Sequence, residues 1–238
     1  MACNAGPDII EDGLVLCSDA GNKKSYPGTG TTWSDLKGSN NGTLTNMDAS
    51  NFSNDYGGVF NFDGANESVN FGNIGPMPDD GCISFWMYST SVQNYRNPLH
   101  TNYGIHGNAG VRFEQYDNYG GNAFGVIKGN DSGSYDFLQY STNGLVNGLL
   151  SENTWYNMAA TWSKSNNRMT GYMNGFKSAS ISTNSSRWAT NFASFYVGVG
   201  YSNGRFFQGK ISNVSCYSKE LTDDEVRQNF EATAGRYT

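Results

Sequence analysis

The 238-residue sequence predicts an all-β domain, a sandwich or barrel of short antiparallel strands, with one helix near the C-terminus. Two observations predict this class. Glycine is abundant (30 residues) and aromatic residues make up 14% of the chain, a composition that suits many tight turns between pleated surfaces. In addition, short segments of β-type patterning recur between turns rich in Gly and Asn, which favours paired sheets over βαβ units.

The predicted strands follow one another at short spacing. Residues 14–17 form the first, 20–32 are predicted to be a loop, and 33–46 are rich in turn residues. The segment 83–88 has apolar side chains at both odd and even positions. Because these point to opposite faces of a strand, we expect it to be buried on both faces. The segment 179–190, rich in Ser and Asn, is predicted to be a long loop. The other predicted strands outside the segment 155–176 are 59–62, 68–71, 98–102, 111–115, 124–128, 137–141, 195–198 and 211–217.

The segment 155–176 carries the clearest local signal. It contains two alternating segments around a polar turn, followed by the dipeptide Asn174-Gly175. Asn-Gly suits a type I′ turn because both residues tolerate positive φ. We therefore predict three strands joined by two tight hairpins.

One helix is predicted near the C-terminus. Thr222 and Glu225 have the spacing of a capping box, in which each side chain accepts a hydrogen bond from the backbone N–H of the other. Val226 and Phe230 are four residues apart, so they share a helix face that should pack on the sandwich. Gly235 is placed to end the helix.

Charge and organisation limit the possible functions. Residues 1–12 are predicted to form an N-terminal arm and 13–238 a single domain. The formal net charge is −6, and no run of Lys and Arg offers the basic patch that a nucleic-acid ligand needs. No apolar run approaches the ~20 residues that span a bilayer, and the N-terminus lacks the features of a signal peptide. We expect no nucleic-acid partner, no membrane segment and no signal peptide.

The four cysteines have no CxxC spacing, so a zinc site is not expected. Three of them, Cys17, Cys82 and Cys216, lie within predicted strands, where a small hydrophobic side chain would serve. We predict free buried thiols in a reduced compartment, and one disulfide among the four, which include Cys3, is the alternative.

The sequence lacks the patterns of a hydrolase. Glycosidases need two carboxylates that face each other, which on one strand requires a spacing of two or four. The nearest pair, Glu114 and Asp117, is three apart and would point to opposite faces. His100 and His106 have no triad context, and we predict that both are polar loop or sheet-edge residues. We expect no enzymatic activity.

Three segments together resemble a known family. Residues 13–46, 57–72 (with a Phe-Asp-Gly turn) and 206–237 resemble laminin-G-like, concanavalin A-like lectin/glucanase modules of the kind found in bacteriophage structural proteins, especially marine ones. The resemblance implies a jelly-roll of two antiparallel sheets with one short helix. It also implies glycan binding, calcium at a loop in some members, and decoration of a capsid or tail. The sequence departs from the family pattern at three positions, Cys17, Cys216 and Asn157.

Side chains of the kinds that bind sugars cluster in one third of the chain. Arg112, Glu114 and Tyr116 are two apart, so one strand would present them on one face. We expect that face to be polar and open, and the alternative is a solvated face with an Arg–Glu cross-strand pair. Core packing is predicted instead for the tryptophans in strand patterns, Trp86, Trp155 and Trp162. The candidate carbohydrate-binding residues are Tyr95, Arg96, His100, Asn102, Arg112, Glu114 and Tyr116.

Asp63, Asn66 and Glu67 form a candidate calcium site. They offer two carboxylates and an amide within five residues. Calcium prefers oxygen ligands from flexible loops. The alternative is a tight turn in which Asp and Asn bond their own backbone.

The first functional hypothesis is a non-enzymatic virion structural protein, a capsid decoration or cement protein with a lectin-like fold on the particle surface. The alternative is a carbohydrate-binding receptor-recognition module of a tail fibre or adhesin. The sequence shows no coiled-coil or repeat stalk, which favours the first hypothesis. The expected partners are viral capsid or tail proteins, together with cell-surface glycans under the alternative. We expect a homo-oligomer located in the virion after assembly in the host cytoplasm.

Overall fold

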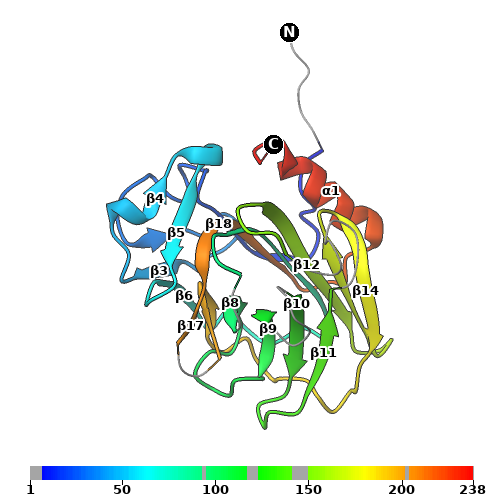
Figure 1. Ribbon diagram of the computed structural model, residues 1–238. Coiled ribbons are helices and arrows are strands. Elements are labelled where there is room, and N and C mark those ends of the chain that lie inside the picture. Colours follow the sequence, from blue (N-terminus) through cyan, green and yellow to red (C-terminus); the bar gives the residue numbers. More distant parts are fainter. Residues whose placement is uncertain (1–6, 93–94, 117–122, 141–149, 202–203, 238) are drawn as a thin grey trace.

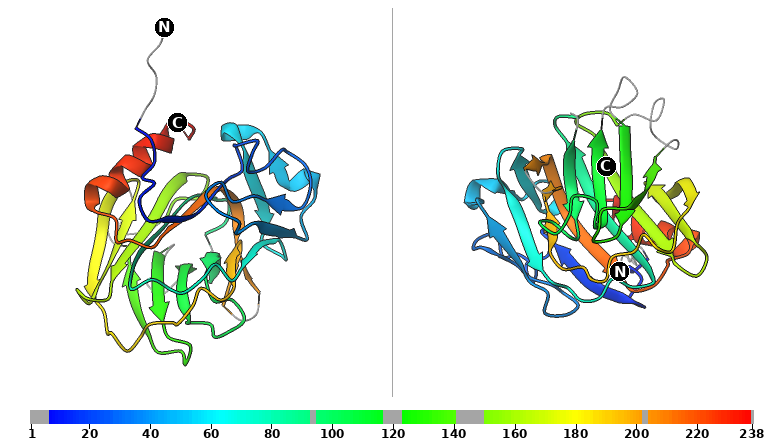
Figure 2. Two further views of the ribbon diagram at one scale, coloured as in Figure 1. Left: turned by 180° about the vertical axis from the view of Figure 1, so that it is seen from behind. Right: turned by 90° about the horizontal axis from the view of Figure 1, so that it is seen from below.

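The computed structural model describes residues 7–92, 95–116, 123–140, 150–201 and 204–237. It shows two largely antiparallel sheets packed face to face, with one helix, α1 (Asp223–Ala234), on the outer face of the first sheet (Figure 1 and Figure 2). The predicted all-β jelly-roll sandwich with a short C-terminal helix is therefore confirmed.

Within the described residues, the first sheet has eight strands in the order β14-β13-β12-β7-β18-β5-β4, with β1 paired to β18. Its strands are β1 (Leu14–Asp19), β4 (Phe52–Ser53), β5 (Val59–Asp63), β7 (Asp80–Ser89), β12 (Trp155–Ser163), β13 (Arg168–Met173), β14 (Phe176–Ser182) and β18 (Gln208–Tyr217). Two 3₁₀ turns, η1 (Ala49–Asn51) and η2 (Asp55–Gly57), flank β4.

The second sheet, over the same described ranges, has ten strands, eight of which follow the order β11-β10-β9-β8-β15-β6-β3-β2. The short strands β16 and β17 pair with each other, and β17 also pairs with β8. The strands of this sheet are β2 (Thr32–Trp33), β3 (Gly42–Thr45), β6 (Ser68–Gly72), β8 (Arg96–His100), β9 (Gly110–Tyr116), β10 (Ala123–Gly129), β11 (Tyr135–Gln139), β15 (Phe195–Val197), β16 (Val199–Gly200) and β17 (Arg205–Phe206).

The predicted double hairpin is confirmed, because β12, β13 and β14 are consecutive neighbours. Asn174 and Gly175 have φ of 51° and 77°, the positive values that the tight turn requires. The prediction of a long loop at 179–190 is wrong in part, because β14 continues as far as Ser182. The strands β2 and β3 lie largely within 33–46, the segment described above only as rich in turn residues. These strands lie at or near sheet edges and carry many polar residues, so hydrophobic alternation does not reveal them.

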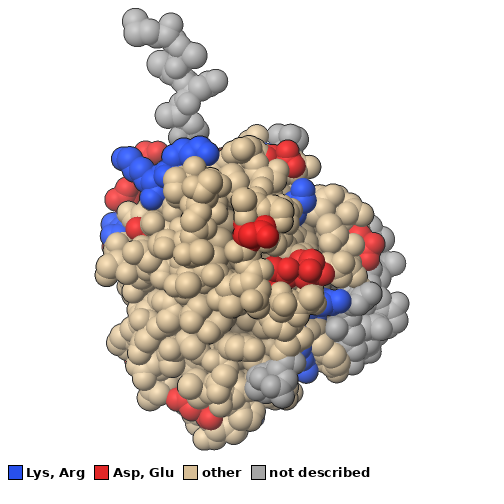
Figure 3. All heavy atoms as spheres, turned by 90° about the vertical axis from the view of Figure 1, so that its left-hand side faces the viewer, with Lys and Arg blue, Asp and Glu red and all other residues tan. Residues whose placement is uncertain are grey.

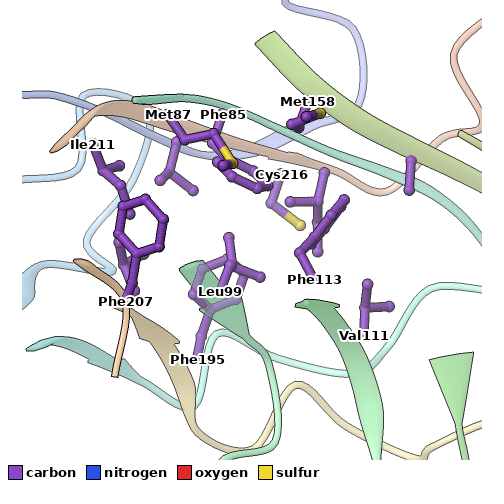
Figure 4. Close-up of a cluster of buried hydrophobic side chains, with 14 of the residues drawn as sticks. Phe85, Met87, Leu99, Val111, Phe113, Met158, Phe195, Phe207, Ile211 and Cys216 are labelled. Carbon is purple, nitrogen blue, oxygen red and sulfur yellow. The ribbon is translucent and has the colours of Figure 1, made fainter. Parts of the chain in front are cut away.

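The core lies between the sheets and is built from apolar side chains of both (Figure 4). Phe85 of β7 and Phe113 of β9 meet edge to face, with ring centroids 4.8 Å apart. This geometry suits the ring quadrupoles and joins the two sheets directly. The core prediction for the tryptophans is confirmed, since all are at least 90% buried: Trp162 in this core, Trp86 and Trp155 in a second cluster beside α1.

The helix α1 begins at the predicted capping box. The Thr222 hydroxyl accepts a hydrogen bond from Glu225 N–H at 3.2 Å, and the Glu225 carboxylate accepts one from Thr222 N–H at 2.9 Å. Val226 is buried, as predicted, and Gly235 caps the C-terminal end with φ −59°. The described part of the N-terminal arm lies against this helix, because Ile10 N–H donates to the side chain of Asn229 at 2.7 Å.

Trp86 joins the first sheet to the C-terminal segment. Its indole stacks on the rings of Tyr237 (centroids 4.0 Å apart) and Phe230 (5.6 Å). The indole Nε1 donates to the Thr233 hydroxyl at 2.8 Å, so its polar atom is also satisfied. Phe230 therefore packs on the sandwich, as its spacing from Val226 predicts.

The three described cysteines are free thiols. Cys82 and Cys216 are buried, as predicted, whereas Cys17 is only half-buried. Burial raises the pKa of the Cys17 thiol to about 11 and also raises that of Cys216, so both thiols stay protonated near neutral pH. Cys3 lies outside the described residues.

Charged side chains are sparse on the surface. Figure 3 shows that the side of the molecule carrying β3 to β6 is mostly uncharged, with a few scattered acidic and basic groups. No helix in the described ranges has the length and apolar character needed to cross a membrane.

Candidate functional site

A pocket of about 260 Å³ opens on the outer face of the second sheet, over β9, β10 and β11. Successive side chains of a strand point to opposite faces. Phe113 and Val126 therefore point into the core, while the residues next to them in sequence point into the pocket. The walls are Tyr95, Asn108, Arg112, Glu114, Tyr116, Ile127, Tyr135, Phe137, Tyr201 and Arg205.

The floor of the pocket is a row of side chains that crosses three strands. Arg112 on β9 pairs in register with Ile127 on β10, which pairs with Phe137 on β11. Gly125 leaves room for the aromatic ring of this row, since a Cβ there would lie 2.4 Å from Phe137. The Tyr116 ring meets Phe137 edge to face at 5.0 Å. The floor therefore joins an aromatic half to a charged half.

Glu114 holds the charged half together. Its Oε2 accepts hydrogen bonds from Arg112 Nη2 at 3.2 Å, from Arg205 Nη1, and from Asn97 Nδ2 at 3.4 Å. The side chains of Arg112 and Glu114 are 2% and 7% exposed. A buried ion pair is stable only when further hydrogen bonds satisfy its members. Arg112 meets this requirement in part, because its Nη1 donates to the Gly107 carbonyl.

The Arg205 guanidinium contacts two tyrosine rings. Its Cζ is 4.0 Å from the Tyr95 ring centroid and 3.9 Å from the Tyr201 centroid, which places it in cation–π contact with both. Both tyrosines have positive φ, 63° and 61°, a region that bulky residues avoid. Backbone strain of this kind persists where the surroundings hold it, and it clusters at functional sites.

The prediction that Arg112, Glu114 and Tyr116 share one strand face is confirmed, because all three line the pocket from β9. The expectation of an open face is wrong. The three residues are only 2–5% exposed, since Tyr201 and Arg205 pack over the first two. The Arg–Glu pair is also not a cross-strand pair, because both residues belong to β9.

Of the other four predicted binding residues, one lines the pocket and three do not. Tyr95 lines the pocket, whereas Arg96, His100 and Asn102 are not among its walls. Arg96 donates to the Phe206 carbonyl at 3.0 Å, and Asn102 donates to the Asp131 carboxylate at 3.4 Å. These two side chains therefore support neighbouring segments rather than the pocket.

His100 is a fully buried residue of β8, and its prediction as a loop or sheet-edge residue is wrong. Its Nε2 lies 2.8 Å from the Ala109 carbonyl oxygen. Burial, reinforced by the Arg112 guanidinium, lowers the pKa of the imidazole to about 3, so the ring is neutral at pH 7. His106 is exposed in a loop, as predicted.

We expect acid to destabilise the protein through His100. Its pKa rises from about 3 in the folded state to about 6.5 on unfolding, so the unfolded chain binds more protons between these values and stability falls as pH falls. His100→Gln keeps a donor for Ala109 and does not titrate. From pH 6.5 to pH 4.5 the wild type should lose roughly 2 kcal/mol more unfolding free energy than this variant in urea titrations. Equal losses would contradict a buried neutral imidazole.

The pocket also contains residues that the sequence prediction did not include. Tyr135 and Phe137 are two apart on β11, and the predicted strand began only at Phe137. A strand prediction extended by two residues would have placed both rings on one face. Nothing in the sequence marks Tyr201 and Arg205, which reach the pocket from a segment distant in the chain. Asn108 and Ile127 complete this group.

The predicted calcium residues lie in and beside the turn between β5 and β6. Asp63 Oδ1 accepts a hydrogen bond from Ala65 N–H at 2.7 Å, and the Glu67 carboxylate accepts one from Asp63 N–H at 3.2 Å. The side-chain hydrogen bond with Glu67 lowers the pKa of Asp63, while burial and Asp63 raise that of Glu67. These contacts match the turn alternative, with Asn66 exposed. The described part of the chain shows no metal-type group of three His, Cys, Asp or Glu, and calcium binding stays a prediction.

Residues 63–227 match the family model described as the Concanavalin A-like lectin/glucanases superfamily, Laminin_G_3. The chain belongs to this family. The resemblance seen in the sequence is thus confirmed for the family, and the bacteriophage setting stays a prediction. No curated protein is detectably similar to this lectin/glucanase-family domain in sequence.

Solved structures share the fold of this lectin/glucanase-family domain. The botulinum neurotoxin serotype D binding domain has a TM-score of 0.68 at 17% identity, covering 93% of this chain and 52% of that chain. The serotype D ligand binding domain in complex with N-acetylneuraminic acid has a TM-score of 0.68 at 18% identity, covering 93% and 51%. Domain 4 of an extracellular arabinanase from Geobacillus stearothermophilus, in complex with arabinotriose, has a TM-score of 0.62 at 15% identity, covering 93% and 100%. The chain thus spans about half the length of the toxin chains, and at these identities the likeness shows the fold alone.

Proposed function

We propose that this chain is a non-enzymatic carbohydrate-binding domain whose site is the pocket over β9, β10 and β11. One observation carries the proposal: the pocket walls place four tyrosines beside an Arg–Glu–Arg cluster on one sheet face. Binding pockets typically combine aromatic surface with a few fixed polar groups that orient the ligand. Saccharides match both halves, since their rings have apolar C–H faces and their hydroxyls bond planar polar groups.

The exposure of the tyrosines suits ring recognition. Tyr135 is 44% exposed and Tyr95 is 42% exposed, whereas the polar cluster beneath them is buried and hydrogen-bonded. A ligand therefore meets open aromatic surface above polar groups that are already held in place. Preorganisation of this kind reduces the entropic cost of binding.

The carboxyl groups of the pocket support binding without hydrolysis. Glycoside hydrolysis needs two carboxyl groups roughly 5–9 Å apart across the scissile bond. Among the described wall residues Glu114 alone carries a carboxylate, and two guanidinium groups already bond it. We therefore propose that no bond of the ligand is broken here. The match covers the whole of the arabinanase domain and 93% of this chain. It supports the proposal because that structure holds arabinotriose.

Tyr135→Ala is expected to weaken saccharide binding about tenfold, because an aromatic contact of about 1.4 kcal/mol is lost. The change should alter unfolding free energy by less than about 0.5 kcal/mol, since the side chain is exposed. The saccharide comes from a glycan array, and affinity is measured by isothermal titration calorimetry. Phe176→Ala is the matched control, as Phe176 is 47% exposed on β14 of the other sheet. An array without hits, or equal weakening by both variants, would contradict the proposal.

The three segments that resemble bacteriophage structural modules favour a setting for this binding. We propose that the domain is displayed, as a homo-oligomer, on a virus particle, either as capsid decoration or as a receptor-recognition module. Quantitative mass spectrometry of purified particles tests this. A copy number near that of the major shell protein supports decoration, a few copies per particle support a tail location, and absence from particles contradicts the setting.

A further inference from the structure

We propose that the saccharide bound in this pocket is anionic, with a carboxylate or sulfate group that is received by Arg205. The inference rests on the proposed function and specifies its ligand class. Three features of the pocket support it: its charge balance, the burial of its cations, and the N–H groups of Arg205 that make no hydrogen bond to the other described residues.

The charge balance of the pocket is positive. Its described walls carry two guanidinium groups, Arg112 and Arg205, and one carboxylate, Glu114. The neighbouring His100 adds no charge because its pKa is about 3. The chain as a whole has a formal net charge of −6, so composition does not account for a positive site. One positive charge is therefore not neutralised by the wall residues.

The burial of these cations increases the effect of that excess charge. The Arg112 side chain is 2% exposed and that of Arg205 is 21% exposed. Electrostatic interactions are stronger away from bulk water, so like charges repel more and an added anion is attracted more. Within the described structure Arg112 Nε is also buried without a hydrogen-bond partner, an unusual state for a charged donor. An anion in the pocket would offset the excess positive charge.

The Arg205 guanidinium keeps N–H groups that can receive that anion. Its Cζ lies 4.0 Å from the Tyr95 ring centroid and 3.9 Å from the Tyr201 centroid, and its Nη1 bonds Glu114. Nε and Nη2 make no hydrogen bond to the other described residues, so we place the anion on this N–H edge. Carboxylate and sulfate groups match this edge with two parallel N–H···O bonds, whereas a hydroxyl makes one. The adjacent rings of Tyr135 and Phe137 provide apolar surface for the sugar that carries the anion.

The test uses matched charged and neutral sugars. A glycan array with sialylated and desialylated pairs is combined with calorimetry on oligogalacturonate, its methyl ester, and a sulfated and an unsulfated galactan oligosaccharide. We expect at least one charged sugar to bind at least tenfold more tightly than its neutral counterpart. A preference for sialylated glycans or oligogalacturonate identifies a carboxylate as the bound group, and a preference for the sulfated galactan identifies a sulfate. Arg205→Gln should remove the preference. Arg168→Gln, at an exposed arginine of the other sheet, should not.

The outcomes separate the two proposals. Equal affinity for charged and neutral partners, or hits confined to neutral sugars, overturns the anionic ligand and leaves carbohydrate binding in place. Failure of every sugar on the array and in calorimetry overturns both. The comparison of charged with neutral sugars needs only the wild-type protein, so it stays decisive if Arg205→Gln fails to fold. Arg205→Lys, which keeps the charge without the planar edge, should retain part of the preference.

Discussion

Glu114→Gln is expected to lower the free energy of unfolding by about 3 kcal/mol. Glu114 is the shared acceptor for Arg112 and Arg205, and its side chain is 7% exposed. Removing one partner of a buried ion pair leaves an uncompensated charge away from water, which costs far more than the loss of an exposed pair. Two guanidinium groups would then repel each other at the binding site.

Urea unfolding followed by tryptophan fluorescence measures the effect on stability. Glu220→Gln is the matched control, because Glu220 pairs with the half-exposed Arg168 at 2.8 Å. Exposed pairs are worth less than about 1 kcal/mol, so this variant should unfold close to the wild type. If both variants lost the same free energy of unfolding, the result would contradict the claim that the buried cluster stabilises this side of the pocket.

Trp86→Ala is expected to destabilise the protein by about 4 kcal/mol, since it removes a large buried side chain and leaves a cavity. The indole is 4% exposed and stacks on Phe230 and Tyr237, with a hydrogen bond to Thr233. Without it, α1 and the C-terminal residues lose these contacts with β7. In Trp86→Ala, we expect deuterium exchange to accelerate relative to the wild type, and to accelerate more for the α1 amides than for the amides of the core strands.

Trp86→Phe is the control for this prediction. It keeps an aromatic ring against Tyr237 but lacks the donor to Thr233, so a smaller loss, near 2 kcal/mol, is expected. Saccharide binding at temperatures where the variants remain folded should be unchanged, because Trp86 belongs to the first sheet and the pocket to the second. Weakened binding by folded Trp86→Phe would show that the two faces are coupled.

Much of the fold could be predicted because its signals are local. The Asn174-Gly175 turn, the capping box of Thr222 and Glu225, and the alternation along β9 each depend on a few neighbouring residues. Steric limits on φ and hydrogen bonds within one turn determine such features whatever the rest of the chain does. Polar strands at sheet edges, such as the end of β14, lack this signal and were predicted as loop.

The binding pocket could be predicted only in part. The alternation of β9 predicts that Arg112, Glu114 and Tyr116 share a face, and Tyr95 lies close enough in sequence to belong to the same cluster. Neither observation says whether that face is open. The structure covers Arg112 and Glu114 with Tyr201 and Arg205, which are about ninety residues away in sequence and contact β9 only through the folded chain.

The sequence by itself determined the β class, the hairpins, the helix and the residues that share each strand face, since backbone geometry repeats every two residues in a strand. The tertiary structure alone decided which loop covers which face. It thereby buried His100 as a neutral ring and paired two arginines with one glutamate. The physical reason is that burial and charge pairing depend on distance in space, and a sandwich brings together segments whose separation along the chain carries no pattern.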